Sequence, residues 1–439
     1  MIDLAFSKTK ADDRKLWIEG GRLDDTVDHA VKNLTYTDFI NKELMQYSVA
    51  ANARAVPSVV DGLKPGQRKI LFSCFKRSLK NEIKVAQLSG YVAEHSAYHH
   101  GEASLAMTIV NLAQDYMGSN NLNILEPLGQ FGTRHQGGKD YASPRYIFTK
   151  LCPLTRMLYP EPDDAILNFL NDDGMKIEPE YYTPILPMVL VNGATGIGMG
   201  WSTFVPCYNP LDLIRCIRKL IQGETLNDQL VPWYYGFKGN VHLDEATQNC
   251  TLTGKYKISG IDTLEITELP VGTWTGDYKT FLESMMEGDK NSQQVSEIRE
   301  YHSQGSIHFV VTFKLGKLDE IRDNLEKKMK LTCSLSLRNM VLFNTEGKIT
   351  RYDTPNDILL EFYGVRLRYY TLRKEHLLRI LKAELQVLGN KVRFINSILD
   401  GSLEINNRKK SELVRVLQER EYMSVNSGSQ TDDHGEDEK

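Results

Sequence analysis

The C-terminal part of the chain carries a hydrophobic repeat that a long helix would place on one face. Seven apolar residues follow one another in alternating steps of three and four over three heptads: Leu378, Leu381, Leu385, Leu388, Val392, Ile395 and Leu399. This spacing is typical of a coiled coil, although an amphipathic helix on a globular core gives a similar pattern. The chain offers no second heptad arm for pairing, so we expect a truncated coiled coil or one that depends on another chain.

The start of this helix is also visible in the sequence. Thr354 can cap it, Pro355 suits the first helical position, and Asp357 places negative charge in the first turn. We therefore predict a long helix from residue 354 onward.

Composition limits the class of protein. A chain of 439 residues, 41% hydrophobic and 25% charged, is expected to form two or three globular domains. No apolar run approaches the ~20 residues of a membrane span, and the N-terminus lacks the apolar core of a signal peptide. Six scattered cysteines without a Cys-x-x-Cys pair predict reduced thiols in a cytosolic or nuclear compartment and argue against a zinc ribbon.

Charge is distributed unevenly along the chain. The formal net charge is −4, yet residues 54–84 contain eight Lys or Arg side chains and two acids. This excess indicates a local polyanion site, although a solvated helix face would have the same composition. Residues 424–439 form an acidic tail that is predicted to be disordered.

Local patterns predict helices first and an α+β region later. Asp38 can cap a helix over 39–47, and further helices are expected over 67–75 and 104–114. Short helices and cations separated by tight turns fit a helix-turn-helix or winged-helix module. After a segment rich in Pro, Gly and Asp, strand-like runs at 252–259, 263–267 and 306–313 predict a separate α+β region.

Tyr146 follows a loop, Gly129–Lys139, that contains four glycines and two cations, and Arg145 precedes it. Glycines allow positive φ and can bring backbone N–H groups close to an anion. A cation beside a phenol favours the phenolate and would stabilise a phosphorane-like transition state. The alternative is that Tyr146 is one of 21 tyrosines and serves packing alone.

Two further segments suggest chemistry more weakly. Residues 94–102 gather three histidines and two glutamates, but the spacing is not typical of zinc, so phosphate contact or proton transfer is favoured over a metal. Gly196–Gly200 is a poor match to a dinucleotide loop because the strand, helix and downstream acid are not evident. The sequence contains no P-loop.

Taken together, the segments resemble the DNA breakage-reunion region of eukaryotic-type DNA topoisomerase II over roughly residues 2–423. The Tyr98-His-His-Gly-Glu102 and Pro144-Arg-Tyr-Ile147 motifs are similar to the eukaryotic rather than the bacterial type. The other matching segments are Val56–Lys69, Lys84–Gln87, Gly118–Asn121, Gly129–Arg134, Gly137–Asp140, Asp172–Gly174, Glu178–Ile185, Asn192–Ser202 and Leu372–Glu375.

The resemblance implies that Tyr146 is the nucleophile that forms a 5′-phosphotyrosyl link, with Arg145 stabilising the transition state. It places His100, Arg54 and Lys64 near the scissile phosphate, and it makes Ile197 an apolar wedge that bends the duplex. A further DNA-contacting segment, Lys330–Asn339, matches less closely. The remaining residues expected to bind DNA are Arg68, Lys69, His99, Arg134, Lys139, Lys330, Arg338 and Asn339.

The fold implied is a multidomain α+β chain with a winged-helix (CAP-like) domain, an α/β tower and a coiled-coil helix. We expect a linker and helix at 1–45, the winged helix at 46–165, the tower at 166–353, the first coiled-coil arm at 354–423 and the tail at 424–439. The metal-binding (Toprim) domain that supplies Mg²⁺, the ATPase domain that binds ATP, and the returning coiled-coil arm are expected outside this chain.

Double-stranded DNA and a second protomer are the expected partners, in the nucleus, without membrane association. The alternative is a DNA-binding or dominant-interfering module that does no chemistry. A tyrosine recombinase is disfavoured because its dispersed Arg/His/Tyr pattern is not evident.

Overall fold

The computed structural model describes residues 1–21, 25–28, 30–244, 249–287, 293–303, 305–406 and 408–423, which divide into two units, residues 1–366 and 367–439. The acidic tail predicted at 424–439 lies outside the described residues. None of the described helices has the length and apolar character needed to cross a membrane. All six cysteines are free thiols, and burial raises the pKa of Cys74 and Cys207 to about 12.

The N-terminal segment is helical. It contains α1 (Ile2–Phe6), α2 (Ala11–Glu19), α3 (Tyr36–Asp38), a π-helical stretch (Phe39–Leu44) and α4 (Met45–Ala55), the last three being continuous. The predicted cap was wrong: Thr35 accepts the N–H of Asp38, and its hydroxyl donates to the Asp38 carboxylate (2.6 Å). The helix also continues beyond residue 47, because the alanine-rich stretch to Ala55 favours helix until Pro57.

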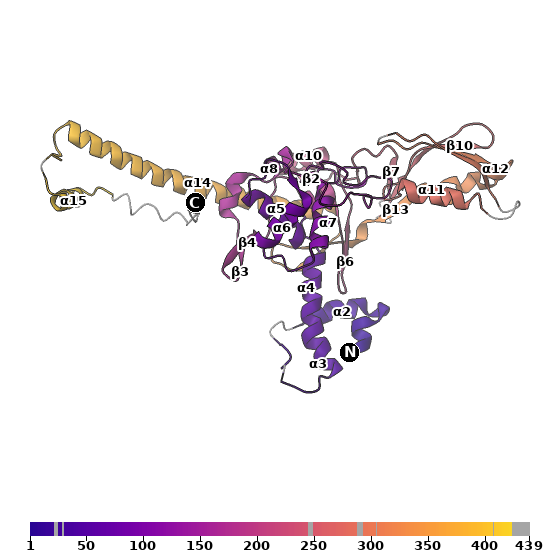
Figure 1. The fold of residues 1–439 in the computed structure, drawn as a ribbon, viewed down its shortest axis with the longest axis horizontal. Coiled ribbons are helices and arrows are strands. Elements are labelled where there is room, and N and C mark those ends of the chain that lie inside the picture. Colours follow the sequence, from indigo (N-terminus) through magenta and orange to yellow (C-terminus); the bar gives the residue numbers. More distant parts are fainter. Residues whose placement is uncertain are drawn as a thin grey trace. The chain divides into compact units, whose positions relative to one another are not determined.

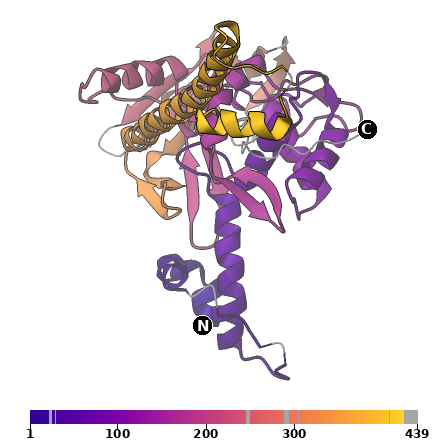
Figure 2. The ribbon, with the colours of Figure 1, turned by 90° about the vertical axis from the view of Figure 1, so that its left-hand side faces the viewer.

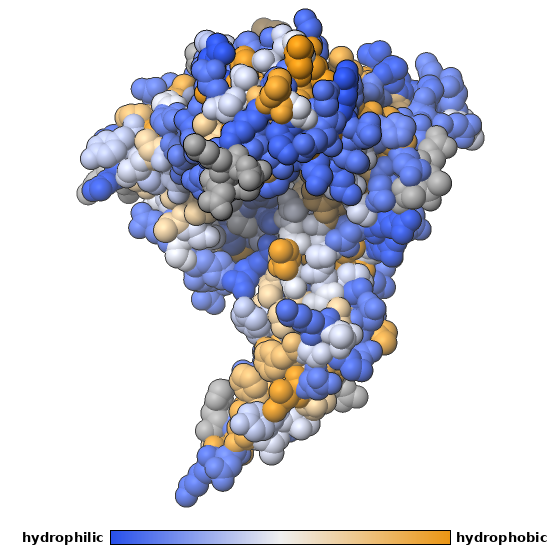
Figure 3. Space-filling view, turned by 90° about the vertical axis from the view of Figure 1, so that its right-hand side faces the viewer, coloured by the Kyte–Doolittle hydropathy of each residue, from blue (hydrophilic) through white to orange (hydrophobic). Residues whose placement is uncertain are grey.

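This segment leaves apolar side chains uncovered. Ile2, Phe6, Leu16, Tyr36 and Tyr47 are exposed. The space-filling view shows pale and orange surface along the narrow N-terminal part, below the bluer body (Figure 3).

Three helices and a short sheet form the next part: α5 (Pro65–Lys76), α6 (Val85–His95), α7 (Glu102–Ala113) and the antiparallel pair β1 (Ile83–Lys84) and β2 (Phe148–Thr149). The expected helices over 67–75 and 104–114 are confirmed as α5 and α7. Helix α6 had not been predicted, because Ser89 and Gly90 weaken its propensity. Its buried residues Val85, Leu88 and Val92 nevertheless have helical spacing.

Two hairpins follow these helices. They are β3 (Phe169–Asp172) with β4 (Met175–Pro179), and β5 (Ala194–Ile197) with β6 (Ser202–Val205). The helices between and beside them are α8 (Pro153–Leu158), a 3-10 turn (Glu161–Ile166), α9 (Met188–Asn192) and α10 (Pro210–Ile221). Both ribbon views show the two hairpins projecting on the side of the body from which α4 emerges (Figures 1 and 2).

The expected α+β region contains two sheets. One has the order β13 (Thr332–Ser336), β8 (Asn249–Thr253), β7 (Asn240–Asp244); the other has β11 (Val295–Glu300), β12 (Phe309–Phe313), β10 (Thr263–Glu268), β9 (Lys255–Ile258). The core of the second sheet includes residues from α11 (Thr275–Ser284), α12 (Lys317–Ile321) and α13 (Leu325–Lys328). These elements lie together in Figure 1.

The strand expected over 252–259 is split at Gly254. Its N–H donates to the Leu331 carbonyl (2.8 Å), and a Cβ at this position would collide with the Glu268 carbonyl. Only glycine allows this approach, so the chain leaves one sheet and enters the other here. The strands expected at 263–267 and 306–313 are confirmed, the latter beginning at Phe309.

A short sheet, β14 (Met340–Phe343) with β15 (Ile349–Tyr352), precedes α14 (Pro355–Leu399), and α15 (Lys410–Glu419) follows. The predicted start of α14 is confirmed: the Asp357 N–H donates to Thr354 Oγ1 (3.2 Å), and the Thr354 N–H donates to the Asp357 carboxylate (2.9 Å). The seven heptad residues are all exposed in the second unit. The helix is thus as expected, and its pairing stays a prediction.

Candidate nucleic-acid interface

Tyr146 precedes β2 in the chain and lies beside the start of α6, which binds the backbone before and after it. The first two N–H groups of α6 donate outside the helix: Val85 to the Ile147 carbonyl (3.0 Å) and Ala86 to the Pro144 carbonyl (3.1 Å). These helix N-terminal donors have no intrahelical acceptors, so they are available to fix the loop. The Tyr146 side chain is 73% exposed, which excludes the interpretation that it only packs.

Arg145 is exposed beside this phenol. Its guanidinium carbon lies 6.0 Å from the centroid of the Tyr146 ring, and it makes no hydrogen bond or ion pair with the described residues. A cation without a protein anion beside an exposed phenol can bind an external anion there.

The histidines of the 94–102 segment lie on the turn between α6 and α7. His100 is exposed, and its ring meets that of Tyr98 edge-on with centroids 5.4 Å apart. His99 Nε2 lies 3.1 Å from the carboxylate of Asp172 at the end of β3. The β3–β4 hairpin therefore holds the turn that presents both histidines.

The glycine loop differs from the anion cradle that its sequence suggested. Three of its N–H groups are used within the protein: Thr133 donates to Asp140 Oδ1 (2.8 Å), Gly138 to the Thr133 carbonyl (2.9 Å) and His135 to Thr133 Oγ1 (3.2 Å). A Cβ at Gly138 would collide with the Gln114 amide. The glycines thus allow the loop to close on itself and to pack against the body, so these donors do not face an anion.

The two cations of this loop have different environments. Arg134 is buried against Glu268, with which it forms an ion pair, and it also donates to the Leu269 carbonyl (3.1 Å). Burial lowers its pKa, which the bond to Glu268 opposes. Lys139 is exposed and its ammonium makes no bond with the described residues. Arg134 therefore serves the link to β10, and the expectation that it binds DNA is corrected.

Arg68 and Lys69 also lie inside the protein, contrary to their predicted DNA contact. Arg68 forms a bidentate pair with Asp61 (Nε–Oδ2 2.7 Å, Nη2–Oδ1 3.1 Å), and the two side chains are 8% and 0% exposed. Lys69 Nζ lies 2.9 Å from Glu178 Oε2 on β4. A charged side chain that is largely buried needs a fixed partner of opposite charge. The ion pairs with Asp61 and Glu178 therefore join α5 to the segments that carry these acids.

A second group of predicted residues surrounds the β5–β6 hairpin. Ile197, at the end of β5, is 88% exposed. The Lys64 ammonium donates to the Thr195 carbonyl (2.7 Å), and burial lowers its pKa. Asn339 donates to Ser202 Oγ (2.9 Å), while its neighbour Arg338 is exposed.

Two predicted residues remain apart from these bonds. Arg54 lies in the last turn of α4, where it is exposed and makes no bond to the described residues. The last residue of the helix, Ala55, lies close to Gly196 of the hairpin. Lys330 lies over the Phe281 ring (4.1 Å) beside the four-stranded sheet. Among the described residues, no hydrogen bond, ion pair or ring contact links Tyr146 or Arg145 to the hairpin group.

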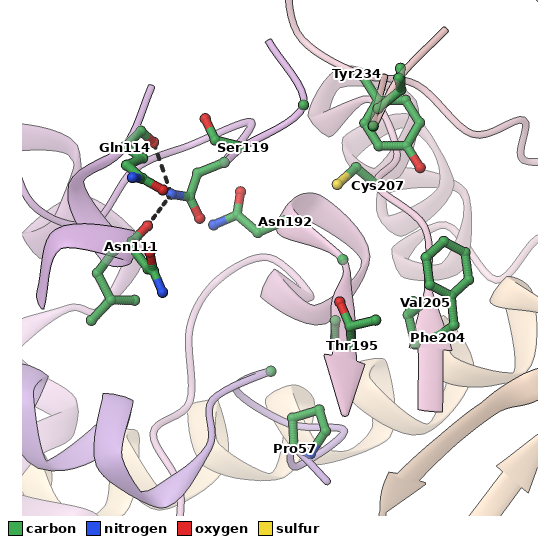
Figure 4. A pocket seen from close by; sticks show the side chains of 18 of the residues that line it. Pro57, Asn111, Gln114, Ser119, Asn192, Thr195, Phe204, Val205, Cys207 and Tyr234 are labelled. Atoms are coloured by element: carbon green, nitrogen blue, oxygen red, sulfur yellow. Dashed lines mark hydrogen bonds between the residues drawn. The ribbon is translucent and has the colours of Figure 1, made fainter. Parts of the chain in front are cut away.

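A cavity of about 660 Å³ adjoins the Lys64–Thr195 bond. Figure 4 shows Asn111, Gln114 and Asn192 on one side, and Tyr234, Cys207 and Phe204 on the other. The side-chain amide of Asn120, which also lines the cavity, donates to the backbone carbonyls of Asn111 (2.7 Å) and Gln114 (2.9 Å).

Sequence reasoning missed two residues that hold the site. Asp172 had been noted in a turn-rich segment and in a segment that matches the family, although an acid in a hairpin turn could also have been considered as a histidine partner. Asn52, on α4, binds the hairpin tip at Met199, and no local pattern distinguishes it from other helical asparagines.

Comparisons with known proteins show the family of this chain. The family model described as DNA gyrase/topoisomerase IV matches residues 54–428, and that of the C-terminal associated domain of TOPRIM matches residues 1–52. DNA topoisomerase 2-alpha of Cricetulus griseus is 50% identical over 438 residues, covering 96% of this chain and 29% of that protein. DNA topoisomerase 2 of Arabidopsis thaliana is 47% identical over 425 residues, covering 96% and 29%.

Among solved structures, the DNA-binding, cleavage and re-ligation domain of Plasmodium falciparum topoisomerase II is similar with a TM-score of 0.85 at 48% identity. The match covers 96% of this chain and 57% of that one. The chain spans less than a third of the length of these two curated relatives. The resemblance inferred from the motifs is confirmed.

Proposed function

Because the chain belongs to the DNA gyrase/topoisomerase IV family, we propose that it is the part of a type II DNA topoisomerase that cuts and rejoins DNA. One observation carries the proposal: Tyr146 presents an exposed phenol on backbone fixed by α6, next to Arg145, a cation that pairs with none of the described residues. In the complete enzyme this chemistry would open one duplex for the passage of another and so change DNA topology.

The reaction exchanges one phosphate ester for another. Tyr146 Oη attacks a DNA phosphorus, the P–O3′ bond breaks, the phenol proton leaves to a base or solvent, and the 3′ oxygen gains a proton. The protein is then joined to the 5′ phosphate, and religation is the reverse step without ATP. Arg145 stabilises the negative charge that develops at phosphorus, and His100 contacts the same phosphate.

The DNA-contacting set is smaller than the sequence suggested. We retain Arg54, Lys64, His99, Lys139 and Ile197, together with Lys330, Arg338 and Asn339. Arg68, Lys69 and Arg134 are omitted because their ion pairs are buried. Exposed cations would neutralise phosphates and make binding dependent on salt, whereas Ile197 would insert between base pairs.

The finer architecture belongs to the same proposal. Helices α5, α6 and α7 with β1 and β2 would form the winged-helix domain, the sheets of the 166–353 region the tower, and α14 the first coiled-coil arm. The exposed heptad residues would pair with a returning arm, and a second protomer would cut the opposite strand. By relation to eukaryotic DNA topoisomerase 2, we place the protein in the nucleus.

The metal and nucleotide would be bound outside this chain. The residues described here form no group of three or more His, Cys, Asp or Glu side chains arranged to bind a metal ion. We assign Mg²⁺ to a Toprim domain, consistent with the family match of residues 1–52, and ATP to an ATPase domain.

The test is to trap covalent protein–DNA adducts with detergent after mixing the chain with DNA, Mg²⁺ and a purified Toprim domain. We expect Tyr146→Phe to abolish adducts and to leave DNA affinity unchanged within about twofold, since phosphate contacts dominate binding. Tyr235→Phe is the matched control, because Tyr235 is also an exposed tyrosine. Adducts that persist in Tyr146→Phe would remove Tyr146 from the mechanism, and binding without adducts in the parent chain would favour a non-catalytic module.

A further inference from the structure

The tip of the β5–β6 hairpin is held by one buried side chain of α4. Asn52 accepts the Met199 N–H at Oδ1 (2.7 Å) and donates from Nδ2 to the Met199 carbonyl (3.2 Å). It is 1% exposed, so water does not compete for these bonds. Both polar groups of one backbone residue, two positions beyond Ile197, are therefore fixed to the helix.

The glycines of the hairpin explain how the backbone comes so close to α4. A Cβ at Gly196 would collide with the Ala55 carbonyl, and one at Gly198 would collide with Asn52 Oδ1. Since side chains alternate along a strand, Gly196 facing α4 requires Ile197 to face away from it. The alternating glycines that resembled a nucleotide loop thus seat the hairpin on the helix and leave an isoleucine outside.

The other side of the tip rests on α2. The backbone at Gly200, with φ +76°, packs against Ala11 and Arg14, and the Lys15 ammonium lies 4.8 Å from the Trp201 ring centroid. The tip therefore lies between two helices of the N-terminal segment, so its position is set by residues distant in the sequence.

We propose that Asn52 is a positioning residue that holds Ile197 rigid as a DNA-bending wedge; this inference rests on the DNA-binding function proposed above. Opening a base step costs free energy, and the wedge can supply it only if the hairpin does not yield. A tip fixed before binding also loses no conformational freedom when DNA arrives, which favours the bent complex.

The experiment measures DNA bending and affinity separately. A short duplex carries a fluorescent donor and acceptor at its ends, so bending raises energy transfer. We expect Asn52→Ala to lose most of the bend and to bind the intact duplex about tenfold more weakly. Binding to a duplex with a short central gap, which bends without unstacking, should match the parent within about twofold.

Three further single variants and one double variant keep the proposal falsifiable. Ile197→Ala should lose the bend, and adding Asn52→Ala to it should change little more, because both act through one wedge. Asn52→Asp keeps an acceptor for the Met199 N–H, but it loses the donor and buries a carboxyl group beside the Met199 carbonyl, so it should bend DNA less than the parent chain even if Asn52→Ala folds poorly. Asn192→Ala is the matched control, since Asn192 makes the same pair of bonds to Leu122 (2.9 and 2.8 Å). It should lower the thermal midpoint and leave bending intact.

The outcomes distinguish the role of Ile197 as a wedge from the role of Asn52 in positioning it. Normal bending by Ile197→Ala would refute the wedge itself, and with it that part of the proposed function. Loss of bending in Ile197→Ala with normal bending in Asn52→Ala would overturn the role of Asn52 alone. A defect in Asn52→Ala that persists on gapped DNA would show a structural loss rather than positioning.

Discussion

Replacing Arg68 with alanine tests whether this residue stabilises the fold or binds DNA. The change leaves the Asp61 carboxylate with two backbone donors, the N–H groups of Leu63 and Tyr182 (both 2.9 Å), and no counter-charge. Breaking a buried pair by removing one partner costs about 3–5 kcal/mol. That is a large fraction of the roughly 5–15 kcal/mol by which a folded domain is stable, so Arg68→Ala should unfold at much lower urea concentration.

The assay pairs urea unfolding with DNA binding at several salt concentrations. Arg54→Ala is the control, because Arg54 is an exposed arginine that binds no described residue. It should keep its urea midpoint and reduce the slope of log affinity against log salt by about 0.9, the loss of one phosphate contact. If Arg68→Ala instead kept the parent's urea midpoint and lowered the salt slope, the structural role argued for Arg68 would be refuted.

Two other predictions concern the packing of Gly138 and the burial of Lys64. Gly138→Ala should lower the thermal midpoint, since φ of +77° costs a non-glycine residue about 1–2 kcal/mol and the new methyl would meet Gln114; an unchanged midpoint would contradict the packed loop. Burial lowers the pKa of Lys64 from its usual 10.5, so an NMR titration of the Lys64 side chain should have its midpoint below that value. Bound DNA should raise this pKa, because a nearby phosphate favours the charged ammonium. The unfolded chain binds the proton of the Lys64 ammonium more tightly than the folded chain does. The free energy of unfolding should therefore increase with pH between the lowered pKa and 10.5, and Lys64→Met should remove this pH dependence.

Much of the chemistry was visible in the sequence because it depends on residue type and local order. The motif around Tyr146 and Arg145 predicted a nucleophile, a role that stays a prediction, and the phenol is exposed in the structure. By contrast, Arg68 and Lys69 had the same appearance as Arg54 in the basic segment. Asp61 pairs with Arg68 from only seven positions away, whereas Glu178 reaches Lys69 across 109 positions, and in both cases the structure was needed to show the pairing.

The sequence by itself determined the long helix and its start, because capping by Thr354 and a heptad repeat act within a few residues along the chain. The tertiary structure alone decided what the glycines do and which charges face outward. Glu178 and Glu268 are brought against Lys69 and Arg134 by packing across 109 and 134 positions, because a largely buried cation needs a fixed partner. Asn52 reaches Met199 across 147 positions, a distance at which local sequence carries no signal.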